Sequence, residues 1–248
     1  MDSTGLWTAL DSGGAITDFI FVHGGLHDGW CWHLVREELE RRGHRTWAPD
    51  LPVDDPGAGA SQYADVVCEA GEESGPDVIV VGHSLGGLTI PVVAQRRPVG
   101  RLVFLAASVP DPGRSYADAV ASGPTRPGPS RTFDDNGYLS FPPSVAASIF
   151  YHDCPPDVVV EALEHLRPQA SRPIVETTPL EAWPDVPANY IACREDRLMS
   201  RAYAMAVVRD RLGTEIVEMD GGHSPFLARP GDLVRLLLEL RGNDREVV

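Results

Sequence analysis

An apolar run that ends abruptly in a serine between glycines constrains the fold of this chain most. Residues 78–81 read Val-Ile-Val-Val, and Gly82-His83-Ser84-Leu85-Gly86 follows directly. The run predicts a buried strand, and the G-x-S-x-G pentapeptide predicts a sharp turn into a helix. Such a turn strains its central residue and leaves no room for a Cβ at either glycine. It lifts the Ser84 hydroxyl out of the sheet, which makes Ser84 a candidate nucleophile. The alternative is an ordinary tight turn with a solvated serine.

Short apolar runs alternate with amphipathic stretches in two parts of the chain. We predict strands at 19–22, 45–48, 78–81, 102–107, 189–193 and 215–219, and helices at 32–42, 61–73, 85–96, 201–212 and 232–240. Continuous apolar strands separated by helices are typical of a parallel sheet covered on both faces. We therefore expect an α/β fold with a mostly parallel central sheet flanked by helices.

Residues 111–187 interrupt this alternation. They are rich in proline and glycine, notably at 123–129, with short helical candidates at 143–151 and 157–166. Prolines this dense are incompatible with central strands. The segment follows the fourth predicted strand, on the side where open α/β sheets bind ligands, so we expect a cap. Residues 1–110 and 188–248 would then form the core. The aromatic residues of the segment would either line an apolar pocket or form the cap's own core: Phe133, Tyr138, Phe141, Phe150, Tyr151 and Trp183.

Charge and composition exclude several function classes. The net charge of −15 argues against binding to nucleic acid or to an anionic membrane surface. No stretch approaches the roughly 20 apolar residues of a membrane span, and the first twenty residues lack a signal-peptide pattern. The four cysteines are scattered without a C-x-x-C pair, which favours reduced thiols in a cytoplasmic protein. All 21 basic residues are arginine, so Schiff-base chemistry and a P-loop lysine are excluded.

A serine nucleophile needs a base, and the base needs a carboxylate. His223 is the candidate base, because it follows a predicted strand in the glycine-containing stretch 220–225. We expect His83 to be structural, because its side chain must point away from that of Ser84. Asp196 and Glu195 both follow the strand at 189–193 and are candidate acids, with Asp111 as the alternative after the fourth strand.

Acyl transfer also needs N–H donors for the oxyanion of its tetrahedral intermediate. The backbone N–H of Leu85 is one candidate, because it opens a helix directly after the nucleophile. The second is the N–H of Gly25, in the His23-Gly24-Gly25 stretch after the first predicted strand. A plain loop is the alternative for that stretch.

These motifs resemble the α/β-hydrolase superfamily, and within it the esterase and hydroxynitrile-lyase branch that includes plant methyl esterases. The similar stretches are 23–30, 82–87, 104–107, 190–193 running into Asp196, and 222–224. The order serine, aspartate, histidine along the chain is that of the fold. The resemblance implies a Ser84-His223-Asp196 triad, which favours Asp196 over Glu195 and Asp111. It also implies an oxyanion hole at Gly25 and Leu85 and a substrate pocket under the cap. We expect neither a cofactor nor a metal.

Two departures from the lyases narrow the expected activity. Those lyases resemble this chain but carry a threonine where Gly24 stands and a lysine where Ser224 stands. We therefore expect a serine hydrolase that cleaves a carboxylic ester, lactone or thioester of a small to medium apolar molecule through an acyl-serine. A small-molecule receptor with little turnover is the alternative, and a cyclase or acyltransferase is a third. A homodimer formed through the cap is a further expectation.

Overall fold

Six parallel strands form the centre of the molecule. The computed structural model describes residues 16–121 and 133–242. The strand order is β2-β1-β3-β4-β7-β8, and every neighbouring pair is parallel. The strands are β1 (Asp18–Val22), β2 (Arg45–Trp47), β3 (Ile79–His83), β4 (Arg101–Leu105), β7 (Ala188–Cys193) and β8 (Ile216–Met219). All six lie at or within a few residues of the predicted runs, and the mostly parallel sheet is confirmed.

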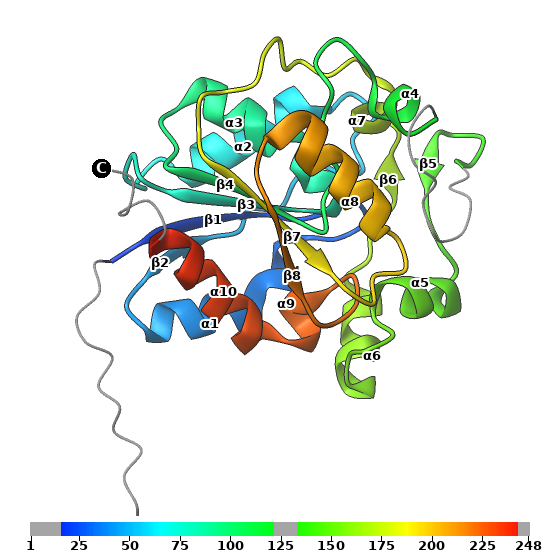
Figure 1. Cartoon of the computed structure of the whole chain (residues 1–248). Helices are drawn as coiled ribbons and strands as arrows, with labels where there is room; N and C mark the ends of the chain where they lie inside the picture. Colours follow the sequence, from blue (N-terminus) through cyan, green and yellow to red (C-terminus); the bar gives the residue numbers. More distant parts are fainter. Residues whose placement is uncertain (1–15, 122–132, 243–248) are drawn as a thin grey trace, which may run out of the picture.

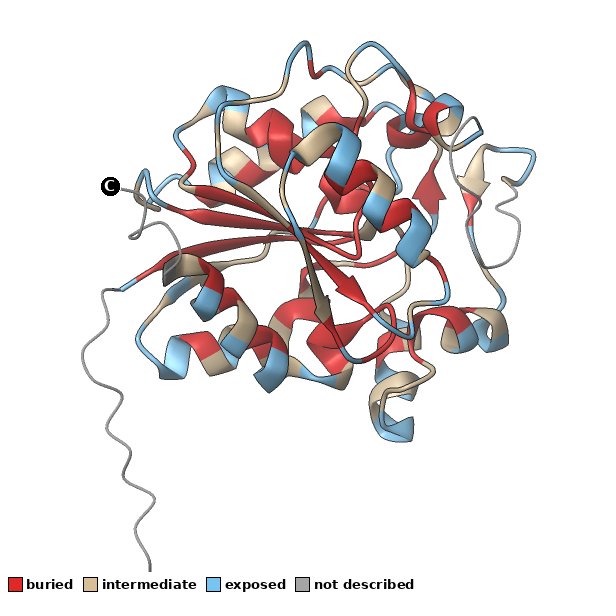
Figure 2. Cartoon of the chain, in the orientation of Figure 1, coloured by how far each residue is buried: buried red, intermediate tan, exposed pale blue. Residues whose placement is uncertain are grey.

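Helices cover both faces of this sheet (Figure 1). One face carries α1 (His33–Arg41), α9 (Pro225–Ala228) and α10 (Pro230–Gly242), and the other carries α2 (Ala60–Ala70), α3 (Ile90–Arg96) and α8 (Arg201–Val207). The central strands β1, β3 and β4 are buried along their whole length, whereas the helices expose their outer sides (Figure 2). This two-sided burial explains why these strands are continuous apolar runs rather than alternating ones.

The predicted helix at 85–96 is wrong in its first half. A 3-10 turn at Ser84–Leu88 (η2) comes first, and α3 begins only at Ile90. Pro91 explains the break, because a proline inside an α-helix cannot donate to the carbonyl four residues earlier. In the first turn of α3 that missing N–H costs nothing. The predicted helix at 201–212 also consists of two parts. The α-helix α8 ends at Val207, and a π-helical turn follows at Val208–Leu212.

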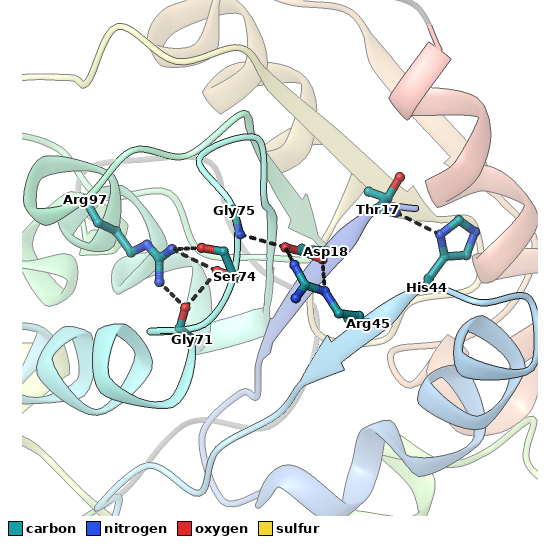
Figure 3. Close-up of polar contacts among 8 residues, drawn as sticks. All are labelled: Thr17, Asp18, His44, Arg45, Gly71, Ser74, Gly75 and Arg97. Carbon is teal, nitrogen blue, oxygen red and sulfur yellow. Dashed lines mark hydrogen bonds and ion pairs between the residues drawn. The ribbon is translucent and has the colours of Figure 1, made fainter. Parts of the chain in front are cut away.

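Polar contacts fasten the amino ends of the strands, away from the site described below (Figure 3). Asp18, the first residue of β1, accepts hydrogen bonds from Arg45 Nε at 2.7 Å and from the Gly75 N–H at 2.7 Å. Arg97 donates to the carbonyl oxygen of Ser74 at 3.0 Å. Burial raises the pKa of the Asp18 carboxyl, but the hydrogen bonds from Arg45 and Gly75 outweigh it, so the pKa lies below its ordinary value. These contacts hold the loop before β3 against the start of β1.

Residues 111–187 contribute no strand to the six-stranded sheet within the described ranges. Their elements are α4 (Tyr116–Ala121), β5 (Tyr138–Leu139), α5 (Pro143–Phe150), α6 (Pro156–Glu164), β6 (Gln169–Ala170) and α7 (Arg172–Val175). The helices α5 and α6 match the two predicted ones, and β5 and β6 form a short antiparallel pair. Figure 1 shows these elements beyond the carboxyl ends of the central strands. The proline-rich stretch 123–129 and residues 1–15 lie outside the described residues.

None of the helices within residues 16–121 and 133–242 has the length and apolar character needed to cross a membrane.

Candidate active site

The turn after β3 has the strained geometry that the pentapeptide predicts. Ser84 has a φ of +49°, in the region that residues with a side chain rarely adopt. A Cβ on Gly86 would lie 2.6 Å from the carbonyl oxygens of Val22 and His23. A Cβ on Gly82 would lie 3.1 Å from the backbone of Gly86. Gly86 therefore lets the turn approach the end of β1 closely, and Gly82 lets the turn close on its own backbone, as expected.

The structure brings Ser84, His223 and Asp196 together in one hydrogen-bonded chain. His223 Nε2 lies 3.0 Å from Ser84 Oγ, and His223 Nδ1 lies 2.8 Å from Asp196 Oδ2. The side chains of His223 and Asp196 are each 1% exposed. The three residues follow β3, β8 and β7, whose carboxyl ends meet at one edge of the sheet.

Backbone donors fix the orientation of the Asp196 carboxylate. Its Oδ1 accepts hydrogen bonds from the N–H groups of Leu198 at 2.7 Å and Met199 at 3.0 Å. Its Oδ2 therefore accepts the proton on His223 Nδ1. This tautomer leaves a lone pair on His223 Nε2 for the Ser84 hydroxyl, which is the arrangement that a general base requires.

The other two candidate acids lie elsewhere. Glu195 accepts a short hydrogen bond from the Gly221 N–H, so it holds the backbone of the histidine loop and does not contact the imidazole. Asp111 faces Arg114 at 3.3 Å and Arg211 at 3.6 Å. Of the three carboxylates considered from sequence, the structure places only Asp196 against His223 Nδ1.

The loop that carries His223 is held from two further sides. His83 Nε2 donates to the carbonyl oxygen of His223 at 2.9 Å, and burial lowers the pKa of His83 well below its ordinary value, so the ring is neutral. This contact agrees with the structural role that the sequence predicts for His83. Asp153 Oδ2, after α5, accepts from the Gly222 N–H at 2.7 Å. Sequence reasoning missed Asp153, because nothing in its surroundings marks it out from other acidic loop residues.

Gly25 and Leu85 flank Ser84 and line one pocket with it. Gly25 lies in a turn in which the His27 N–H donates to the carbonyl oxygen of Gly24 at 3.4 Å. Leu26, in the same turn, has a φ of +67°. Leu85 is the second residue of η2. The N–H groups in the first turn of a helix have no hydrogen-bond acceptor within that helix. The structure thus sets two backbone segments with available N–H groups beside the serine hydroxyl.

Two buried histidines hold the turn that contains Gly25. His23 donates from Nδ1 to the carbonyl oxygen of Gly24 at 2.9 Å and accepts from the Leu51 N–H at 2.9 Å. His27 donates from Nδ1 to the carbonyl oxygen of Gly25 at 2.9 Å and accepts from the Tyr151 hydroxyl at 2.9 Å. Burial lowers the pKa of His23 to about 4 and that of His27 to about 3. Both rings are therefore neutral, and nothing in the sequence pattern around them predicts these contacts.

The pocket above Ser84 holds about 370 Å³ of empty space, its opening to solvent included, and has a mainly apolar lining. Among the residues that the structure describes, Ser84 and Gln169 are the two that contribute polar side chains to it. The full lining is Gly25, Leu26, Ser84, Leu85, Leu139, Phe141, Phe150, Gln169, Ile174 and Leu198. Of the six aromatic residues considered, Phe141 and Phe150 therefore line this pocket. Tyr138 bonds to a backbone carbonyl and Trp183 packs on Phe104.

No group of three or more histidine, cysteine, aspartate or glutamate side chains suited to a metal ion occurs in the described part of the chain.

A family model described as the alpha/beta hydrolase family matches residues 19–236. The chain belongs to the alpha/beta hydrolase family. Within this family it is 28% identical to methyl jasmonate esterase 1 of Vitis vinifera, over 90% of this chain and 95% of that protein. It is 27% identical to a pyrethroid hydrolase of Sphingobium wenxiniae, over 90% of this chain and 87% of that protein. The crystal structure of a pyrethroid hydrolase from Sphingobium faniae JZ-2 matches its fold with a TM-score of 0.77 and 24% identity, covering 94% of this chain and 99% of the other.

Proposed function

We propose that this alpha/beta hydrolase cleaves carboxylic esters through an acyl-serine intermediate. The observation that carries the proposal is the hydrogen-bonded chain from Ser84 Oγ through His223 to Asp196. Its serine lines an apolar pocket. The relatives support the reaction class, because two similar proteins are named as a methyl jasmonate esterase and a pyrethroid hydrolase.

The proposed mechanism uses each group for one task. Ser84 Oγ attacks the ester carbonyl carbon while His223 Nε2 takes the hydroxyl proton, and Asp196 stabilises the imidazolium that forms. The N–H groups of Gly25 and Leu85 donate to the oxyanion. The intermediate collapses as His223 returns the proton to the leaving alcohol. Water then attacks the acyl-serine with His223 again as base, which releases the acid and restores Ser84. No step needs a cofactor.

The pocket supports a substrate of small to medium size with an apolar acyl or alcohol part. Of the ten lining residues that the structure describes, half come from residues 111–187. We therefore propose that this segment is a cap that selects the substrate, on a core of residues 1–110 and 188–248. Esters, lactones and thioesters share the same attack on a carbonyl carbon. A cytoplasmic location and a homodimer formed through the cap stay predictions.

Hydrolysis of a graded ester panel tests this function. We would compare the wild-type protein with Ser84→Ala on p-nitrophenyl acetate, p-nitrophenyl butyrate and methyl esters of increasing acyl size. We expect wild-type turnover and a loss of kcat on the order of 10⁴- to 10⁶-fold in the variant. Equal rates of wild-type protein and variant on every ester would overturn the proposal. Tight binding of an ester without turnover would favour the receptor alternative.

A further inference from the structure

The side-chain amide of Gln169 lies buried at the edge of the pocket, beside the oxyanion donors. Gln169 belongs to β6 and has no solvent exposure. It lines the pocket together with Ser84 and Gly25. Its Oε1 lies 3.1 Å from the position that a Cβ on Gly25 would take, so the missing side chain of Gly25 is what lets this buried oxygen lie close to the Gly25 backbone.

The partners of the amide nitrogen determine which end faces Gly25. Gln169 Nε2 donates to the carbonyl oxygen of Ala170 at 2.8 Å and lies 3.4 Å from that of Val53. It also lies 3.2 Å from the Tyr63 hydroxyl. Because backbone carbonyls only accept hydrogen bonds, exchanging the nitrogen and the oxygen would set Oε1 against two acceptors. The carbonyl end of the amide is therefore the end beside Gly25.

This oxygen has no hydrogen-bond partner among the residues that the structure describes. Buried polar atoms nearly always find a partner, and leaving one unsatisfied is unfavourable. Within residues 16–121 and 133–242, every side chain that lines the pocket is apolar apart from those of Ser84 and Gln169. In pockets of this kind a few placed polar groups fix the orientation of the ligand.

We propose that Gln169 determines specificity, because its Oε1 accepts a hydrogen bond from a hydroxyl on the acyl part of the substrate, at the α- or β-carbon. The inference rests on the proposed function. Gly25, which holds the carbonyl oxygen in that mechanism together with Leu85, lies against Gln169. All three residues line the same pocket. A substituent within reach of Oε1 is therefore close to the carbonyl and stays on the acyl-serine after the alcohol leaves. The substrate class is esters of hydroxycarboxylic acids with an apolar remainder.

A substrate series on the wild-type protein tests the proposal without any variant. The α series is methyl phenylacetate with its 2-hydroxy and 2-methoxy derivatives, and the β series is methyl 3-phenylpropanoate with its 3-hydroxy and 3-methoxy derivatives. The methoxy group keeps the oxygen but cannot donate. In at least one series we expect kcat/KM for the hydroxy ester to exceed that for the methoxy ester by about 10- to 100-fold.

Gln169→Met then assigns this preference to the residue. Methionine keeps the length of the side chain and removes the acceptor, so we expect the ratio of hydroxy to methoxy rates to fall to near one. The ratio compares two substrates on one protein, so a general loss of activity cancels. Gln95→Met, at an exposed position on α3, is the matched control and should keep the wild-type ratio.

The outcomes separate this inference from the proposed function. Ser84-dependent hydrolysis with equal rates on hydroxy and methoxy esters in both series would overturn the inference alone. A preference that persists in folded Gln169→Met would also overturn it. Absence of turnover on every ester would overturn both. If Gln169→Met does not fold, the wild-type series still decides.

Discussion

Replacing Asp196 by asparagine should invert the hydrogen bonding of the catalytic histidine while preserving the fold. The N–H groups of Leu198 and Met199 keep the side-chain oxygen at the Oδ1 position. The new NH₂ group therefore takes the place of Oδ2, 2.8 Å from His223 Nδ1. It donates to Nδ1, so the ring proton moves to Nε2 and points at Ser84 Oγ. An imidazole without a lone pair on Nε2 cannot take the serine proton, and we expect kcat to fall on the order of 10⁴-fold, about 5 kcal/mol.

Steady-state hydrolysis of p-nitrophenyl acetate measures this loss, and circular dichroism with thermal unfolding shows whether the variant folds. Asp111→Asn is the matched control, because Asp111 faces two arginines away from His223. We expect its kcat to stay within about threefold of wild type, as substitutions distant from the reacting groups usually have small effects. A folded Asp196→Asn variant within about tenfold of wild type would refute the reasoning. So would a large loss in Asp111→Asn.

Two further predictions concern stability. Gly86→Ala places a methyl group 2.6 Å from the carbonyl oxygens of Val22 and His23. We therefore expect the free energy of unfolding in urea to drop by about 1–3 kcal/mol or more. An unchanged urea midpoint would contradict the turn geometry. Burial lowers the pKa of His23 to about 4 and that of His27 to about 3, so the unfolded chain, with histidines near about 6.5, binds protons that the fold excludes. Their contribution to stability is fully present above about pH 6.5 and is lost as the pH falls, by about 1 kcal/mol per pH unit for each ring. Urea unfolding between about pH 7 and pH 5 measures this loss. The free energy of unfolding of His27→Gln should depend less steeply on pH. A wild-type free energy of unfolding that does not change over this range would contradict the neutral rings.

The candidate site was predictable from sequence because it lies where strands end. In a parallel sheet the carboxyl ends of neighbouring strands share one edge, so residues that follow apolar runs come together whatever their distance along the chain. Ser84, Asp196 and His223 each follow such a run, and the structure brings them within hydrogen-bond distance. The strands were equally accessible, because two-sided burial gives continuous apolar runs. The helix after β3 begins later than predicted, because Pro91 has to lie in the first turn of an α-helix.

The contacts that support the site could not be read from the sequence. Asp153 on the Gly222 N–H and Gln169 beside Gly25 lie in segments without periodicity, and their partners come from distant parts of the chain. Such contacts depend on how a loop-rich segment packs over the sheet edge, which local propensity does not determine. Tyr151 was a candidate lining residue of the pocket, but its hydroxyl hydrogen-bonds to His27 instead. The packing of the segment over the sheet edge determines this contact too.

Covalent labelling of Ser84 tests the central claim most directly. A fluorophosphonate forms a stable adduct with a serine only when a base activates the hydroxyl, so intact-mass measurement followed by peptide mapping reports the nucleophile. We expect one adduct on Ser84 in the wild-type protein, slower labelling in Asp196→Asn, and none at any position in Ser84→Ala. Folded wild-type protein that stays unmodified, or that carries its adduct on another residue, would contradict the account.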